Sequence, residues 1–452
     1  MTEILAIQQY KQARLARDAR FDGQFFVAVK TTQIFCRPIC PANAPKEENV
    51  EYFQMAQQAM QAGYRPCLRC RPDSAPKSFA WKGVDTTVER GQKLLSQHMD
   101  ISVQHIADKL GVTDRYFRQL FQRNLGLSPK QYQLFEQLLF AKQLLHQGSM
   151  SINDVALSCG FSSTRRLQDN LKRVTGLTPK QMKSGKTINN KTIRVELAFR
   201  PPYNWQHMRD FLQLRAIPEL EQISADSYAR TFTLEGTKGW FCAKYIPTKH
   251  HFSVTVELDT VTALKNVLLN IRRILDLDAD IGIIDQQLET CGIGRENLIS
   301  GLRIPGVWDV FEAGCRAILG QQISLKASIN LVTQLTQQLG PNIAQRRYFP
   351  SPDAIANSDL SFLKIPQSRR TTLQTFSAYF AQSAAQDPDS WLALKGIGPW
   401  TVSYAKMRGL SVPDIWLGTD LVIKKQLEKH PVNADHARPW RSYLTLQLWS
   451  MA

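Results

Sequence analysis

Two close pairs of cysteines constrain the first part of this 452-residue chain more than any other feature. Cys36 and Cys40 are separated by three residues, Cys67 and Cys70 by two, and 26 residues lie between the pairs. Four soft thiolates brought together suit a tetrahedral zinc ion. Because four of the eight cysteines cluster in this way, the pattern indicates a metal site in a reducing compartment rather than a disulfide framework. The spacing alone favours a purely structural zinc knuckle.

The charge of the chain indicates a polyanionic partner. The net charge is +17, and residues 1–190 hold 27 Lys and Arg against 15 Asp and Glu. Such an excess points to DNA or RNA, although a solvated basic surface is the alternative. The length predicts three or four domains. We find no signal-peptide core and no apolar run long enough to span a bilayer, so we expect a cytoplasmic protein without a membrane partner.

A repeated segment organises the next part of the chain. Residues 85–184 have apolar positions at helical spacing, and Gly-Leu-Ser-Pro-Lys-Gln-Tyr at 126–132 recurs as Gly-Leu-Thr-Pro-Lys-Gln-Met at 176–182. Before each copy lie a helix, a turn glycine and a second helix, which is the layout of a helix-turn-helix that reads a major groove. The basic candidates for DNA contact on the second helix are Arg115 and Arg118 in the first copy and Arg165 in the second. A helical bundle with polar outer faces is the alternative.

The pattern changes after a linker at 184–192. Residues 193–199 and 252–258 alternate as half-buried strands do, with one helical stretch at 205–214 between them. From about 271 the chain reads as helices broken by Gly-Pro turns. Gly396-Ile397-Gly398 forms a turn between two of these helices, where small residues let the backbone approach a DNA phosphate. Asp420 follows about 20 residues later and is either a catalytic carboxylate or a helix N-cap.

The segments around the cysteines resemble a known family. Residues 31–40 (TTQIFCRPIC) and 63–73 (GYRPCLRCRPD) resemble the N-terminal domain of Ada-type methylation-response regulators, at all four cysteines. The resemblance implies that Cys36 is a zinc-bound nucleophile that accepts a methyl group from a DNA methylphosphotriester, which activates DNA binding. Arg65, Arg69 and Arg71 are then candidates for phosphate contact. The repeated helices resemble the AraC-type DNA-binding domain, which implies promoter DNA and RNA polymerase as partners. We expect the protein to be a monomer. The Pro-Cys-His-Arg site of a second methyltransferase does not occur.

The last 260 residues resemble the 3-methyladenine DNA glycosylase of AlkA type, within the helix-hairpin-helix superfamily. The resemblance covers nearly all of 193–449 and includes RPPYNW at 200–205 and FEAGCRAILGQQIS at 311–324. It implies flipping of a damaged base out of the duplex and its excision to leave an abasic site. The implied roles are catalysis by Asp420, a base pocket of Trp400, Tyr404 and Trp449, phosphate contact at Gly396 and Gly398, a DNA wedge at Gln321 and Gln322, and a monovalent cation at the carbonyls of Leu394 and Ile397.

One position separates two reaction classes. Glycosylases that also cut the strand carry a lysine two residues after the hairpin glycines, as a Schiff-base amine. This chain has Trp400 there, so we expect a monofunctional DNA-3-methyladenine glycosylase. Gln322 departs from the intercalating Leu of the family. The competing hypotheses are a regulator whose degenerate glycosylase domain serves as a DNA clamp, and an oxidised-base glycosylase with lyase activity.

Taken together, these patterns predict a multidomain, mainly α protein with α+β parts. We expect a small α+β domain at 1–80 that binds one zinc ion through four cysteines, and a double helix-turn-helix domain at 84–184. A small α+β domain at 192–270 and an all-α helix-hairpin-helix glycosylase domain at 271–452 complete the expected order.

Overall fold

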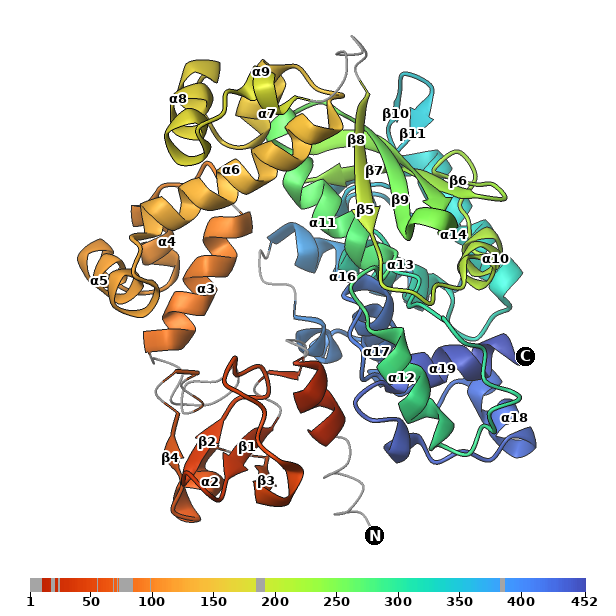
Figure 1. The fold of residues 1–452 in the computed structure, drawn as a ribbon. Coiled ribbons are helices and arrows are strands. Elements are labelled where there is room, and N and C mark those ends of the chain that lie inside the picture. Colours follow the sequence, from red (N-terminus) through yellow and green to blue (C-terminus); the bar gives the residue numbers. More distant parts are fainter. Residues whose placement is uncertain are drawn as a thin grey trace. The chain divides into compact units, whose positions relative to one another are not determined.

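The computed structural model describes residues 10–17, 21–22, 25–54, 56–67, 69–70, 72, 84–97, 99–183, 192–382 and 387–452. The chain divides into two compact units, residues 1–189 and 190–452. Figure 1 shows the first unit in red to yellow and the second in green to blue. Within the described ranges, no helix combines the length and apolar character needed to cross a membrane.

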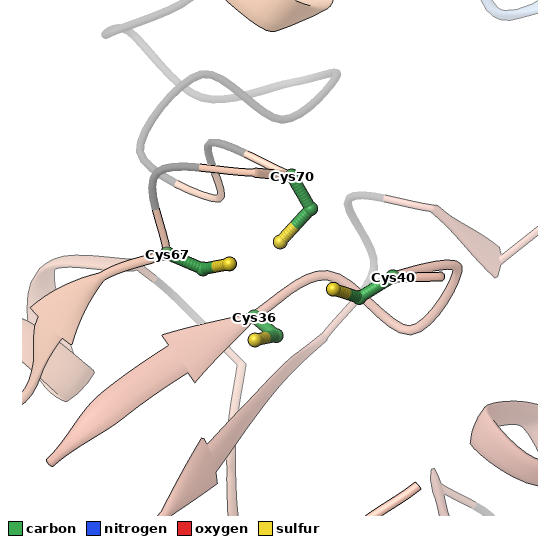
Figure 2. Close-up of side chains that lie close together, drawn as sticks. All are labelled: Cys36, Cys40, Cys67 and Cys70. Atoms are coloured by element: carbon green, nitrogen blue, oxygen red, sulfur yellow. The ribbon is translucent and has the colours of Figure 1, made fainter. Parts of the chain in front are cut away.

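The first unit begins with a small mixed sheet. Its strands β1 (Phe26–Val29), β2 (Ile34–Cys36), β3 (Val50–Phe53) and β4 (Arg65–Pro66) lie in the order β3-β1-β2-β4, and helix α2 (Ala56–Gln61) precedes β4. Strands β2 and β4 are parallel, with Phe35 opposite Pro66, and the backbone N–H of Cys67 donates to the carbonyl of Phe35 at 2.9 Å. This register brings the two cysteine pairs to one end of the sheet (Figure 2).

The rest of the first unit is helical. Its helices are α3 (Val84–Gln97), α4 (Val103–Lys109), α5 (Asp114–Leu125), α6 (Pro129–Gln147), α7 (Ile152–Ser158), α8 (Thr164–Thr175) and α9 (Pro179–Met182). In each copy, the repeated segment contains the end of one helix and the start of the next. Ser128 and Thr178 each form a capping box at the start of α6 and α9, and Gly126 and Gly176 end α5 and α8 in the left-handed conformation. Each copy therefore contains two helices joined by a turn, as expected.

The second unit begins with a five-stranded antiparallel sheet. Its strands are β5 (Ile193–Ala198), β6 (Glu221–Ile223), β7 (Ser227–Leu234), β8 (Thr237–Ile246) and β9 (His251–Leu258), in the order β5-β9-β8-β7-β6. Helix α10 (Trp205–Gln213) follows β5. Strands β5 and β9 and this helix match the sequence analysis, whereas β6, β7 and β8 are strands that the sequence analysis did not predict.

Helices make up most of the remainder. They are α11 (Leu264–Ile274), α12 (Ile281–Glu289), α13 (Val310–Leu319), α14 (Leu325–Leu339), α15 (Pro352–Ala356), α16 (Gln367–Gln382), α17 (Pro399–Gly409), α18 (Leu421–Lys429) and α19 (Arg441–Ser450), with a short hairpin of β10 (Asn342–Ile343) and β11 (Arg346–Arg347). Buried side chains from α13, α14, α16 and α17, such as Ile318, Leu335, Phe376 and Val402, form one core. The expected multidomain, mainly α fold with α+β parts is confirmed.

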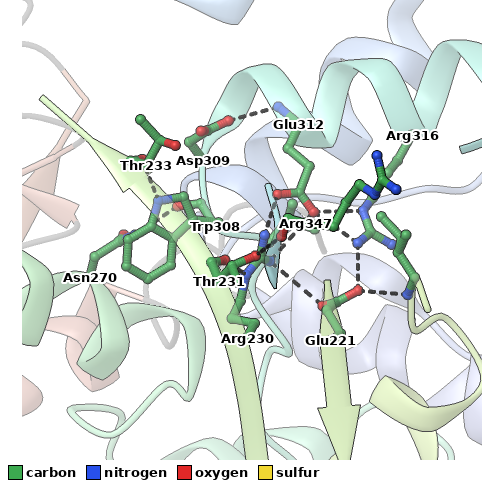
Figure 3. A network of polar contacts seen from close by, with 12 residues as sticks. Glu221, Arg230, Thr231, Thr233, Asn270, Trp308, Asp309, Glu312, Arg316 and Arg347 are labelled. Atoms are coloured by element: carbon green, nitrogen blue, oxygen red, sulfur yellow. Dashed lines mark hydrogen bonds and ion pairs between the residues drawn. The ribbon is translucent and has the colours of Figure 1, made fainter. Parts of the chain in front are cut away.

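A buried network of charges fixes α13 against the sheet (Figure 3). Arg230 of β7 is 1% exposed and donates to Glu312 of α13 at 2.7 Å, while Arg316 of α13 is 2.8 Å from Glu221 of β6. Although burial alone would raise it, the charges of Arg316 and Arg230 hold the pKa of Glu221 at about 2. These buried ion pairs fix the orientation of α13. The candidate DNA wedge at 321–322 comes directly after the end of this helix.

Candidate functional site

The four cysteines of the first unit form a compact sulfur cluster. Cys36, Cys40, Cys67 and Cys70 have Sγ atoms that all lie within 4.8 Å of one another (Figure 2). The backbone N–H of Arg37 donates to Sγ of Cys70 at 3.3 Å. Four thiolates at this separation fit the tetrahedral coordination of a zinc ion, with a backbone donor supporting one ligand from outside.

The electrostatics of the cluster call for a cation. Contact with the sulfur atoms of Cys40 and Cys67 raises the pKa of the Cys36 thiol, and contact with Cys36 and Cys40 raises the pKa of Cys70. Neighbouring thiolates cannot all be ionised beside one another without positive charge between them. A divalent ion supplies that charge, so the donor set fits a Zn²⁺ ion in both geometry and electrostatics.

A cavity of about 400 Å³ lies next to the cluster. Cys36, Cys40 and Cys67 line it, together with the side chains of Arg14, Arg17, Thr31 and Thr32. Arg65 and Arg69 are exposed and do not line this cavity, and Arg71 lies outside the described residues. Two of the basic groups at this cavity, Arg14 and Arg17, therefore come from the stretch at 10–17, which the sequence analysis did not single out, and the third is Arg37, next to Cys36 in the chain.

Arg37 connects the cysteine cluster to the first helix of the DNA-binding part. Its side chain is 2% exposed and is paired with Asp22, and its guanidinium also donates to the carbonyl of Cys70 at 3.3 Å. A further N–H lies 2.7 Å from the carboxylate of Glu89 on α3. One buried guanidinium thus contacts both a ligand-bearing loop and α3.

The candidate DNA-contact arginines lie on the second helix of each helix-turn-helix. Arg115 and Arg118 are exposed on α5, and Arg165 is exposed on α8. Arg118 pairs with Asp114 at 2.7 Å, and Arg165 lies 3.9 Å from Asp169, each one turn away along its helix. Exposed pairs of this kind are weak, so the guanidinium groups can exchange them for phosphate or base contacts at little cost.

In the second unit, Asp420 is held by N–H donors from three directions. It is the N-cap of α18, and Oδ1 accepts from the backbone N–H groups of Val422 at 3.0 Å and Ile423 at 3.3 Å. The indole Nε1–H of Trp400 donates to Oδ2 and that of Trp449 to Oδ1, each at 3.2 Å. An N-cap alone would not need two indoles, so the carboxylate is both a cap and the centre of an aromatic site.

Aromatic rings surround this carboxylate. Trp400 and Tyr404 stack with ring centroids 5.3 Å apart, and Trp449 faces Phe211 of α10 at 6.3 Å with an interplanar angle of 26°. Sequence reasoning missed Phe211, which lies 238 positions before Trp449. The guanidinium of Arg215 lies over the Phe211 ring at 3.7 Å and that of Arg408 at 4.7 Å.

The hairpin glycines differ in what their surroundings require. Gly396 has φ +90°, and a Cβ there would lie 2.2 Å from Oγ1 of Thr372. Gly398 has open space around its Cα. The hairpin is thus packed on one side and open on the other, as close approach of a phosphate requires.

The two candidate wedge residues also behave differently. Gln321 donates through Nε2 to the carbonyl of Gly396 and to Oγ1 of Thr401, both at 3.1 Å, so it ties the loop to the hairpin. Gln322 is exposed and has φ +56°. Of the pair, Gln322 is the side chain available to enter DNA.

Comparisons with known proteins agree with this arrangement. Residues 9–73 match the metal-binding domain of Ada, residues 106–185 a helix-turn-helix domain, and residues 194–309 the AlkA N-terminal domain. The probable bifunctional transcriptional activator/DNA repair enzyme AlkA of Mycobacterium tuberculosis is 31% identical over 96% of this chain and 94% of its own length. DNA-3-methyladenine glycosylase 2 of Escherichia coli is 30% identical over 56% of this chain and 95% of its own length.

A further relative covers the first unit. The bifunctional transcriptional activator/DNA repair enzyme Ada of Escherichia coli is 32% identical over 43% of this chain, which spans about half of that protein (53%). The matched metal-binding domain and the sulfur cluster identify a site for one Zn²⁺ ion, and DNA is the macromolecular partner. The chain therefore belongs to the family of bifunctional transcriptional activators and DNA repair enzymes that join an Ada-type metal-binding regulator to an AlkA-type repair domain.

Proposed function

We propose that the second unit is a monofunctional DNA-3-methyladenine glycosylase that hydrolyses the N-glycosidic bond of alkylated bases and leaves an abasic site. The observation that carries this proposal is the Asp420 carboxylate between the indole N–H groups of Trp400 and Trp449, each at 3.2 Å. Aromatic faces and a fixed carboxylate are what a flipped cationic base and an electron-poor sugar require.

The proposed reaction follows from these positions. The base stacks on the aromatic rings, and the bond between its ring nitrogen and C1′ of the sugar breaks, with both electrons leaving on the base. Asp420 stabilises the positive charge that develops at the sugar and orients water toward C1′. Water forms the new C1′–O bond and its proton passes to Asp420 and then to solvent. Trp400 has no amine to attack C1′, which favours hydrolysis over a Schiff-base route.

The test is release of 3-methyladenine from alkylated duplex DNA. Asp420→Asn keeps an acceptor for the cap but has no negative charge, so we expect excision to fall by about two or more orders of magnitude while folding and DNA binding persist. The wild-type protein treated with borohydride should trap no covalent DNA adduct. Excision by Asp420→Asn at the wild-type rate would remove Asp420 from the mechanism. An inactive wild type would favour the DNA-clamp alternative.

We also propose that the first unit accepts a methyl group on Cys36 and thereby regulates transcription. The cavity beside Cys36 supports this, because it combines a half-buried sulfur with the exposed side chain of Arg17, which suits a DNA phosphate. The Cys36 sulfur would form the new S–CH3 bond as the methyl–oxygen bond breaks, and the phosphate would leave as a diester anion. A zinc ion held by the four cysteines would keep the attacking sulfur in its thiolate form.

Loss of one negative charge at the cluster would then tighten binding to promoter DNA through Arg115, Arg118 and Arg165. RNA polymerase would be the downstream partner of a monomeric regulator. The measurement is promoter affinity before and after exposure to methylphosphotriester DNA, at low and high salt. Cys36→Ser should neither accept the methyl group nor change its affinity. Equal affinity of methylated and unmethylated wild type at low salt would contradict the charge switch.

A further inference from the structure

A histidine contacts the helix that carries Trp449. His207 lies on α10, and its Nε2 is 2.6 Å from Oγ of Ser450, the last residue of α19. Oγ of Ser450 is in turn 2.6 Å from the carbonyl of Leu446, one turn back along α19. Two segments of the second unit that are 243 positions apart thus meet through one imidazole and one hydroxyl.

This chain of contacts fixes the tautomer of His207. A carbonyl oxygen can only accept, so the single hydroxyl proton of Ser450 points toward Leu446. The hydroxyl oxygen must then accept from His207, and Nε2 carries the ring proton. Nδ1 is left with a bare lone pair. This atom is buried and has no hydrogen-bond partner among the residues that the structure describes.

The ring is also held in its uncharged form. Burial, followed by the positive charge of Arg215, lowers the pKa of His207 to about 4, although Asp210 acts in the opposite direction. Arg408 places a second guanidinium over the ring of Phe211. At neutral pH the imidazole is therefore a neutral Nε2–H donor.

His207 is connected to the aromatic site in two ways, through ring contacts and along the backbone of α19. Its ring centroid is 6.2 Å from that of Phe211, one helical turn later, and Phe211 faces Trp449 at 6.3 Å. Along the backbone, Ser450 directly follows Trp449, whose indole N–H holds Asp420 at 3.2 Å. Both the face of the Trp449 ring and the residue next to it are thus supported from α10.

We propose that His207 is a positioning residue for base excision: its Nε2–H holds the end of α19 through Ser450, and so keeps Trp449 in hydrogen-bonding position on Asp420. This inference rests on the glycosylase function proposed above. It assigns no contact between His207 and the substrate.

Packing alone does not account for an imidazole at this position. A phenylalanine would keep an aromatic ring beside Phe211 and would leave no buried lone pair, whereas an unsatisfied buried acceptor is destabilising. What phenylalanine lacks is the donor to Ser450. A stabilising role and a positioning role therefore predict opposite results for the same substitution.

The test compares four variants of the whole chain. We expect His207→Phe to melt at or above the wild-type temperature while kcat for 3-methyladenine release falls about tenfold and KM changes less than about threefold. Ser450→Ala should show the same kcat defect, and the double variant should be no worse than either single one, because all of them break one interaction. His207→Gln, which places a donor near the position of Nε2, should recover most of the rate.

A control variant and an independent measurement distinguish failure of the positioning role from failure of the glycosylase function. Ser377→Ala removes another buried hydroxyl of the second unit, one with no hydrogen-bond partner in the described part of the chain, and should leave kcat unchanged. Histidine nitrogen NMR of the full chain should show His207 as the Nε2–H tautomer at neutral pH, whether or not the protein is active. Wild-type kcat in His207→Phe, or additive losses in the double variant, would overturn the proposal. An inactive wild type with the expected tautomer would instead count against the glycosylase function.

Discussion

At the scale of single residues, Asp309 caps a helix with its carboxylate at a position where a negative charge is unfavourable. It is the N-cap of α13, and Oδ1 accepts from the backbone N–H of Glu312 at 2.7 Å. Burial, followed by the negative charge of Glu312, raises the pKa of Asp309 to about 6, in spite of the nearby Arg230 and Arg273. The folded protein therefore holds a proton on Asp309 in a pH range where the unfolded chain releases it.

Asp309→Asn should stabilise the protein at neutral pH. Asparagine keeps the capping acceptor and carries no charge. The stability linked to the protonated Asp309 is fully present below about pH 4 and is lost as pH rises through about 6. The variant should therefore gain up to about 2–3 kcal/mol in unfolding free energy at about pH 8, at roughly 1.4 kcal/mol per pKa unit, and clearly less at about pH 5. Denaturant unfolding at the two pH values measures this, and an equal difference at both would contradict it.

At the scale of elements, the two glycines of the hairpin before α17 are expected to have different roles. Gly396 is needed for stability, and Gly398 for contact with DNA. Gly396→Ala places a Cβ against Thr372 in a left-handed conformation, so we expect a loss of about 1–3 kcal/mol in unfolding free energy. Gly398→Ala meets no neighbour within 4 Å and should leave stability within about 0.5 kcal/mol. Its methyl group would occupy the space through which a phosphate approaches.

The matched measurement is thermal unfolding beside affinity for duplex DNA that contains an abasic site. Gly398→Ala should weaken binding about tenfold with an unchanged melting temperature, whereas Gly396→Ala should lower the melting temperature first. If both variants lose stability equally, the open side of the hairpin has a packing role and the assignment of phosphate contact fails.

The sequence predicted the elements whose residue pattern arises from one structural requirement, such as helix capping or metal binding. Helices α6 and α9 were predictable because their capping segments repeat, and the cysteine cluster because four ligands of one kind lie close together in the chain. Strands β7 and β8 were not. The middle of β7 is buried on both faces, and Trp240 and Cys242 put apolar residues on the outer face of β8, so neither strand alternates in sequence.

Prediction of the candidate sites from the sequence was limited in a similar way. Trp400, Tyr404 and Asp420 come from one stretch of 21 residues. Trp400 and Tyr404 lie one turn apart on α17, and Asp420 follows after one short connection, at the start of α18. Phe211 and His207 reach the same site through the packing of α10 against the end of α19. Arg14 and Arg17 reach the cavity beside Cys36 from a helical stretch without a motif. Contacts between distant segments of this kind leave no periodicity in the sequence.

At the scale of the whole molecule, all four cysteine ligands lie in the first unit and all groups around Asp420 in the second. Removing zinc with a chelator should therefore abolish methyl transfer and lower the melting temperature of one unit, because a zinc site of four thiolates contributes directly to folding. Excision of alkylated bases by the same full-length protein should stay within about twofold. Calorimetry and base release on one sample check both, and a parallel loss of excision would show that the units depend on one another.

If the second unit is the glycosylase proposed above, the contacts of Asp420 also bear on which lesions this site would process. Within the described residues, its four partners are two indoles and two backbone amides, none of which gives up a proton at physiological pH. None of these four partners could act as a general acid toward a departing base. A purine alkylated on a ring nitrogen leaves as a neutral molecule, whereas an ordinary purine would have to leave as an anion. Under the glycosylase function proposed above, undamaged DNA would be spared because the leaving group, rather than the protein, must supply the positive charge.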